Sequence, residues 1–199
     1  MTRHGDFYTD RIALVTGGAS GIGAALCRAL VAEGARVIVA DVNLEGAREV
    51  ATALGSNVAR AVHLDVTDRE AYAATVADVV ATEGRIDYLF NNAGIAVIGN
   101  VLKMAPEHWD RLVDVNIRGV HHGVEAAYAT MVAQGSGHIV NTASVAGLIP
   151  TPGFTAYGMT KHAVVGLSVS LRPEAERYGV KVSAVCPGVI NSNMAETAQ

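Results

Sequence analysis

Apolar and polar positions follow one another in blocks along this chain: short β-branched apolar runs precede longer stretches with apolar residues three or four apart. Continuous short apolar runs are typical of strands buried on both faces of a parallel sheet. We expect six such strands, at 12–16, 36–41, 59–66, 86–93, 137–144 and 181–188. The helical spacing predicts intervening helices at roughly 22–33, 44–54, 68–83, 107–133 and 157–178.

Residues with strong local preferences mark the ends of these helices. Asp68 is expected as an N-cap. Glycines stand where helices should end and a left-handed residue is favoured, namely Gly34, Gly55, Gly84 and Gly135. Pro173 does not suit a helix interior, where we expect it to kink the helix or remove a hydrogen bond.

Strands that alternate with helices indicate βαβ units and a parallel sheet covered on both faces. Six strands in this order predict a doubly wound α/β domain of the Rossmann type, with ligands at the carboxyl ends of the strands. The 199 residues contain no low-complexity linker and no internal repeat, so 1–199 is expected to form a single domain.

Composition narrows the class of protein. Half of the residues are hydrophobic and 17% are charged, which points to extra surface buried between subunits. A net charge of −4 offers no basic footprint for nucleic acid, and no apolar run is long enough to span a membrane. The seven histidines show no metal-ligand spacing, so no metal site is expected. The polar start lacks a secretory signal, and Cys27 and Cys186 fit a reduced, cytoplasmic protein.

The stretch "VTGGASGIGAAL" follows the first strand and opens the first helix. Gly17, Gly21 and Gly23 have the spacing G-x3-G-x-G, and their missing side chains would let the backbone approach a pyrophosphate at the positive end of the helix. The alternative is a plain glycine-rich turn, which the position between a strand and a helix disfavours. We expect the phosphates of a dinucleotide here, with Ser20 and Ile22 of the same turn.

Strand two ends in Asp41, 18 residues after Gly23. A carboxylate at this place accepts both hydroxyls of an adenosine ribose and repels a 2′-phosphate. Val42 follows it and the glycine-rich turn has no basic residue, so NAD is favoured over NADP. The alternative is an acid that serves only the turn or a helix N-terminus. Asp65 and Val66, at the end of strand three, are expected beside the adenine.

Lys161 is one of three lysines in the chain and lies within the nearly all-apolar stretch "FTAYGMTKHAVVGLSVSL". A charge in such a run is costly unless another group compensates it. Tyr157 is four residues earlier on the same helix face, and Ser144 ends strand five. Because a strand end and the start of the next helix converge at the carboxyl edge of a sheet, these side chains are expected near the cofactor.

Tyrosine, with an ordinary pKa of about 10, is a poor base at neutral pH. A lysine ammonium ~4 Å away, at an effective dielectric constant of ~20, would stabilise the phenolate by about 4 kcal/mol and lower its pKa by roughly 3. Tyr157 would then act near neutrality as a base, or as an acid in the reverse reaction. The alternative is a structural Lys161 whose stem packs while its ammonium reaches water.

Several motifs, in this order, resemble the short-chain dehydrogenase/reductase family in its common single-domain form. They are "TGGASGIG", "NNAG" (91–94), Asn116 in "DVNIRG", Ser144, "YGMTK" and "PGVINS" (187–192). The resemblance extends from the first strand to the end of the chain and implies an NAD(P)-dependent oxidoreductase that acts on CH–OH groups. The chain departs from the common pattern at Ala143, where the family has Ser, and at Ser192, where it has Thr.

The resemblance also implies site residues. The active tetrad would be Asn116, Ser144, Tyr157 and Lys161. Within it, Ser144 would hold the substrate oxygen and Asn116 would hold a water that links Lys161 to solvent. Residues that would flank the cofactor or contact its nicotinamide end are Asn92, Ala93, Gly94, Pro187, Gly188, Ile190 and Ser192.

These expectations combine into NAD-dependent oxidation of a secondary alcohol, or reduction of the matching ketone. Val97, Leu148, Pro150 and Phe154 favour an apolar substrate. One alternative is an NADP(H)-dependent carbonyl or 3-oxoacyl reductase. Another is a non-catalytic nucleotide-sensing or scaffold protein on the same fold, which the complete set of Ser, Tyr, Lys and Asn disfavours.

Helices 107–133 and 157–178 have little charge on any face, so part of their surface should be buried. The resemblance implies that they pair across a subunit interface, in a homodimer or homotetramer. It also implies a substrate lid, a further helix and a seventh edge strand, for which this chain has no residues before Gln199. A protein that stops there is expected to bind NAD but to turn over poorly and aggregate through an exposed edge at 181–188.

Overall fold

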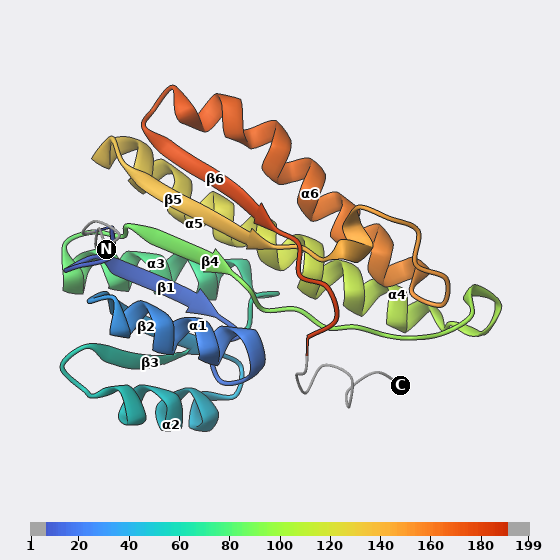
Figure 1. Ribbon diagram of the computed structural model, residues 1–199, viewed down its shortest axis with the longest axis horizontal. Helices are drawn as coiled ribbons and strands as arrows, with labels where there is room; N and C mark the ends of the chain where they lie inside the picture. Colours follow the sequence, from blue (N-terminus) through green and yellow to red (C-terminus); the bar gives the residue numbers. More distant parts are fainter. Residues whose placement is uncertain (1–6, 191–199) are drawn as a thin grey trace, which may run out of the picture.

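The computed structural model describes residues 7–190, which contain a six-stranded parallel sheet in the order β3-β2-β1-β4-β5-β6 (Figure 1). The strands are β1 (Ile12–Thr16), β2 (Arg36–Asp41), β3 (Ala59–His63), β4 (Tyr88–Asn91), β5 (Gly137–Thr142) and β6 (Val180–Val185). The α-helices are α1 (Gly21–Ala32), α2 (Leu44–Leu54), α3 (Arg69–Glu83), α4 (Pro106–Val113), α5 (Gly119–Gln134) and α6 (Thr155–Glu176). This confirms the predicted doubly wound α/β fold.

Two hydrophobic clusters lie on opposite faces of the sheet. One contains Leu14, Ile38, Leu89 and Ile139 and packs on α3, α5 and α6. The other includes their strand neighbours, such as Val15, and packs on α1 and α2. Because both faces are covered, the strands are apolar at successive positions rather than at every second one.

The strand order reverses between β1 and β4, which are parallel neighbours although many residues separate them in the chain. Chain connections leave the carboxyl ends of these two strands in opposite directions, and a crevice opens between them. The fold therefore places the glycine-rich turn after β1 beside residues 92–94 after β4.

Four strands end earlier than the sequence predicts. The strands end at His63, Asn91, Thr142 and Val185, whereas strands to 66, 93, 144 and 188 were expected. Residues just beyond these ends, among them Val66, Ala93, Ser144 and Pro187, line the cavity at this edge of the sheet. At the helix ends, the four glycines expected to close helices all have positive φ, from 65° at Gly135 to 104° at Gly55.

The helix expected at 107–133 is wrong as a single α-helix. A π-helical segment, η2 (Asp114–Arg118), separates α4 from α5. A π-turn inserts one extra residue into the helix and is frequent at functional sites. Asn116 lies at its centre and is fully buried.

Pro173 lies inside α6, which continues past it to Glu176, and the expected loss of one hydrogen bond follows from this position. The missing N–H leaves the carbonyl of Val169 without its helical donor. Val169 is 56% exposed, so water can replace that donor. Among residues 7–190, no helix is long and apolar enough to cross a membrane.

Candidate active site

The glycine-rich turn is shaped for close approach of a ligand. Gly17 has φ +65°, and a Cβ there would lie 2.9 Å from the Cα of Ala93. A Cβ on Gly23 would collide with the carbonyl oxygen of Gly17. Helix α1 begins at Gly21, and within the described residues the side chain of Ser20 makes no capping hydrogen bond. The first N–H groups of α1 thus remain available to an anion such as a pyrophosphate.

Both carboxylate oxygens of Asp41, at the end of β2, accept hydrogen bonds from backbone N–H groups. Its Oδ2 accepts from the backbone N of Ala19 at 3.0 Å, and its Oδ1 accepts from that of Asn43 at 2.9 Å. The carboxylate therefore has the turn role that the sequence left as an alternative. These bonds also fix its orientation at the cavity that it lines, and each oxygen keeps a further acceptor position.

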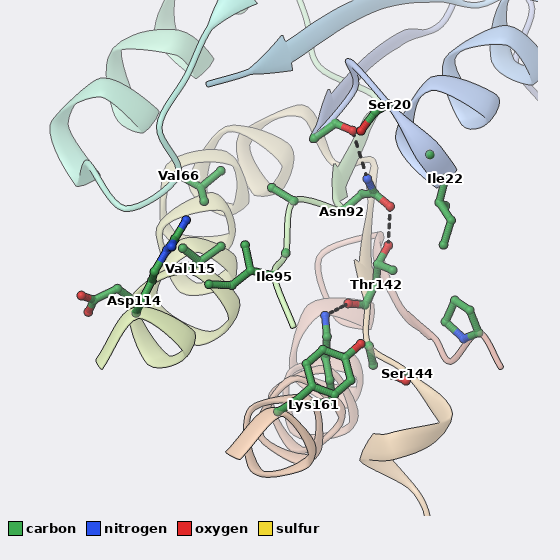
Figure 2. A pocket seen from close by; sticks show the side chains of 18 of the residues that line it. Ser20, Ile22, Val66, Asn92, Ile95, Asp114, Val115, Thr142, Ser144 and Lys161 are labelled. Atoms are coloured by element: carbon green, nitrogen blue, oxygen red, sulfur yellow. Dashed lines mark hydrogen bonds between the residues drawn. The ribbon is translucent and has the colours of Figure 1, made fainter. Parts of the chain in front are cut away.

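A cavity of about 1020 Å³ runs along the carboxyl ends of the strands and joins most of the predicted site residues. Figure 2 shows Ser20 and Ile22 near one end of the view, Ser144 and Lys161 at the opposite end, and Val66 with Val115 to one side. The predicted residues that line it are Gly17, Ser20, Gly21, Ile22, Asp41, Asp65, Val66, Asn92, Ala93, Gly94, Ser144, Tyr157, Lys161, Pro187, Gly188 and Ile190. Gly23 and Asn116 lie behind this lining, and Ser192 falls outside the described residues.

The ammonium of Lys161 lies in the protein interior, where its side chain is 2% exposed. Its Nζ donates to the carbonyl of Thr142 at 2.9 Å, and Thr142 in turn donates through Oγ1 to Asn92 Oδ1 at 3.4 Å (Figure 2). A Cβ on Gly94 would lie 3.4 Å from this Nζ. Burial lowers the pKa of Lys161 to about 8. The buried charge is thus compensated in part by a carbonyl oxygen that the sequence did not indicate.

Tyr157 lies one helical turn before Lys161, in the first part of α6. The Nζ of Lys161 is 5.6 Å from the centre of the phenol ring, and the ring of Phe154 contacts the same ring edge-on. Burial raises the pKa of Tyr157, and a hydrogen bond with Ser144 opposes this increase. The expected decrease is therefore not present in the structure, and the phenol holds its proton at neutral pH.

Asn116 links three segments through its side-chain amide. Its Oδ1 accepts from the backbone N of Ile95 at 2.9 Å, and its Nδ2 donates to the carbonyl of Ile95 at 2.9 Å. The same Nδ2 donates to Thr160 Oγ1 at 3.1 Å, and Thr160 Oγ1 donates to the carbonyl of Tyr157 at 2.7 Å. These contacts tie the π-segment to the part of α6 that carries Tyr157. The water-holding role of Asn116 stays a prediction.

Sequence reasoning missed Thr142 and Thr160. Both are hydroxyl residues in apolar surroundings, and Thr160 is completely buried. Thr142 precedes Ser144 by two positions, so a strand period of two would have placed both on one side of the chain. Thr160 directly precedes Lys161, but nothing in its spacing indicates contact with Asn116.

The family model described as short chain dehydrogenase matches residues 11–199. This chain belongs to the short-chain dehydrogenase/reductase family. It is an oxidoreductase of the class that acts on alcohol or carbonyl groups. Members of the family bind NAD(P), and the glycine cradle, the free N–H groups of α1 and the Asp41 carboxylate all suit such a cofactor.

Curated relatives of this short-chain dehydrogenase include oxidoreductase UcpA from Salmonella typhimurium, which is 41% identical over 192 residues. That alignment covers 95% of this chain and 73% of the relative. The 3-alpha-(or 20-beta)-hydroxysteroid dehydrogenase of Mycobacterium bovis is 40% identical, over 94% of this chain and 71% of the relative.

Solved structures of the family superpose on the fold described above. NAD⁺-bound xylitol dehydrogenase matches with a TM-score of 0.88 and 34% identity, over 92% of this chain and 71% of the other. Levodione reductase matches with a TM-score of 0.90 and 37% identity, over 95% and 75% of the two chains.

Proposed function

We propose that this short-chain dehydrogenase uses NAD(H) to oxidise a secondary alcohol or to reduce the matching ketone. One observation carries the proposal: Ser144, Tyr157 and Lys161 line the same cavity as the glycine-rich turn and Asp41. The cavity can thus hold a dinucleotide along its length with a reacting group beside the tyrosine. When bound, the nicotinamide cofactor supplies the acceptor or donor of the hydride.

The residues divide the proton chemistry between them. The Tyr157 phenol gives its proton to the carbonyl oxygen in reduction and takes a proton from the alcohol in oxidation. The Ser144 hydroxyl holds that same substrate oxygen. The Lys161 ammonium favours the phenolate, because a positive charge near the ring stabilises the negative oxygen.

The choice of NAD over NADP rests on Asp41. Its carboxylate lines the cavity and has acceptor positions left for two ribose hydroxyls, but a 2′-phosphate would meet a like charge. Val42 beside it is 63% exposed and offers no cation to pair with a phosphate. The NADP-dependent reductase remains the second candidate, and the cofactor ratio distinguishes the two.

The double variant Asp41→Ala, Val42→Arg should shift preference towards NADP. It removes the repulsive carboxylate and adds a guanidinium that can pair with a phosphate. The ratio of kcat/KM for NAD to that for NADP should fall by at least about 100-fold. Val42→Ala is the matched control and should leave the ratio unchanged. An unchanged ratio in the double variant would mean that Asp41 does not face the ribose.

The substrate is proposed to have an apolar body. Ile95, Ile98, Phe154 and Val189 line the cavity, and Phe154 packs against Tyr157. Of the residues that the sequence suggested, Phe154 lines the cavity, whereas Val97, Leu148 and Pro150 do not. The names of the relatives refer to a hydroxysteroid, xylitol and levodione. Among compounds of these kinds, an apolar lining favours a substrate that is less polar than xylitol.

Formation of NADH with a panel of cyclic and linear secondary alcohols tests the function. Tyr157→Phe is the control, and NADH formation at the wild-type rate in that variant would contradict the mechanism.

A further inference from the structure

His122 makes a hydrogen bond that none of the motifs above includes. It lies in the first turns of α5, and its Nδ1 is 2.9 Å from the backbone carbonyl oxygen of Val66. A carbonyl oxygen only accepts, so Nδ1 must be the protonated nitrogen of the ring. The bond joins α5 to the loop between β3 and α3, across 56 residues of sequence.

Val66 forms part of the cavity wall. It is 7% exposed and lines the cavity together with Asp65. Its side chain packs on the backbone of α5, where a Cβ on Gly119 would lie 2.7 Å from Val66 Cγ2. Helix α5 thus contacts Val66 twice, through packing at Gly119 and through the hydrogen bond from His122.

At its start this loop is held by the backbone N of Leu64, which donates to the carbonyl of Asp41 at 3.0 Å, and the bonds of Asp65 itself are local. Asp65 Oδ1 accepts from the backbone N of Thr67 at 2.9 Å and from its hydroxyl at 2.7 Å. The Asp65 bonds shape the turn but do not position Val66 against the neighbouring helix. The His122 bond does so, because it holds the peptide group between Val66 and Thr67 from a neighbouring helix.

We propose that His122 is a positioning residue for the adenosine end of the cofactor site. It holds Val66 and Asp65 where they line the cavity, and it does not itself line that cavity. The inference rests on the proposed function, because adenosine is the ligand assigned to this end. Loss of the hydrogen bond from His122 to Val66 should weaken cofactor binding without changing the chemistry at Tyr157.

His122→Leu and His122→Asn form a matched pair of variants. The two new side chains have nearly the same shape, but only Asn has an N–H at the δ position, where the histidine donates. His121→Leu is the control for surface effects, since His121 is exposed and neighbours His122 on α5. Thermal unfolding of each variant separates a binding effect from a loss of stability.

Calorimetric titration with NADH and with ADP-ribose measures binding. His122→Leu should weaken both by a similar factor, about three- to tenfold, because both ligands contain the adenosine. His122→Asn should bind within twofold of the wild type, as should His121→Leu. In turnover, His122→Leu should raise the KM for NAD by the same factor and leave kcat at saturating NAD within twofold.

Two results would overturn the inference: unchanged binding in His122→Leu, or a loss in His122→Asn as large as that in His122→Leu. The second would show that the N–H is not what matters. Failure of the proposed function looks different, because the wild-type protein itself would then not bind NADH or ADP-ribose.

Discussion

At the scale of single residues, Lys161 shows how function costs stability. The ammonium is almost fully buried, and its bond to the Thr142 carbonyl is one to a neutral acceptor. Burial of a charge with neutral partners is unfavourable, which is why the pKa falls from 10.5 to about 8. A buried lysine in this apolar helix lowers the stability of the fold, so stability alone does not explain its presence.

Lys161→Met should therefore stabilise the protein while it abolishes turnover. In the wild type, the buried charge of Lys161 lowers the free energy of unfolding, and this loss of stability is fully present below pH 8. It disappears as pH rises towards 10.5, because in that interval the unfolded chain still binds the proton whereas the folded chain releases it. The gain in the free energy of unfolding should be about 1–3 kcal/mol at pH 7, reduced by the lost bond to Thr142. Urea unfolding at pH 7 and pH 9.5 should show the gain shrink. A less stable variant at pH 7 would contradict this.

The pKa of Tyr157 predicts opposite pH profiles for the two directions. Since burial raises this pKa, the phenol is protonated at neutral pH and ready to donate. Reduction should be nearly independent of pH around neutrality. Oxidation needs the phenolate, so kcat/KM for the alcohol should rise with pH, up to about tenfold per unit. Initial rates in both directions between pH 6 and 9 check this. A flat oxidation profile would mean that another group accepts the proton.

At the scale of elements, the π-segment and α6 are joined at the part of the cavity that holds Tyr157 and Lys161. Asn116 and Thr160 are both completely buried and bonded to each other. Through Thr160, the π-segment reaches the carbonyl of Tyr157, the residue whose phenol is proposed to react. The π-segment thus directs the side chain of Asn116 towards Thr160 of α6.

Thr160→Val should lower kcat by about tenfold, because it keeps the shape but removes the hydroxyl between Asn116 and Tyr157. Binding of NADH should stay within twofold of the wild type. Thr160→Ser restores the hydroxyl and should recover most of the rate. Steady-state kinetics with saturating NAD provide the measurement. Equal kcat in the Val variant and the wild type would show that this link does not position the tyrosine.

The same elements show what sequence can predict. Strand and helix order follow from apolar periodicity, and the glycine turn, Asp41, Ser144 and Lys161 follow from motifs at element ends. The π-segment does not, because it depends on Asn116 capturing the backbone of Ile95, a residue 21 positions away. The direction of the Tyr157 pKa shift was also wrong, since a charge pair is visible in sequence whereas the burial that opposes it arises from packing.

At the scale of the whole molecule, α6 leaves exposed a stripe that contains no Asp, Glu, Lys or Arg. The stripe follows the helical spacing of three and four and consists of Met159, His162, Gly166, Val169 and Pro173. Met159 is 42% and Val169 is 56% exposed. An apolar stripe of this regularity on a free surface favours contact with another helix. A homo-oligomer through α5 and α6 stays our prediction.

Light scattering at micromolar concentration should report at least a dimer. Val169→Asp should shift the protein towards the monomer, because it places a charge in the middle of the stripe. Leu102→Asp is the matched control, since Leu102 is 93% exposed but belongs to neither helix. A wild-type monomer, or an equal effect of the two variants, would contradict the interface.

The place of β1 in the middle of the sheet has a consequence for biosynthesis. Ala13 pairs with Tyr88, so the centre of the sheet cannot close until the ribosome has released the chain beyond Asn91. Until then β1, β2 and β3 can pair only with one another, and the edge of β1 that will meet β4 stays open. The crevice between β1 and β4 does not exist in that interval. A nucleotide can therefore stabilise the nascent protein only after the chain up to Asn91 has been synthesised.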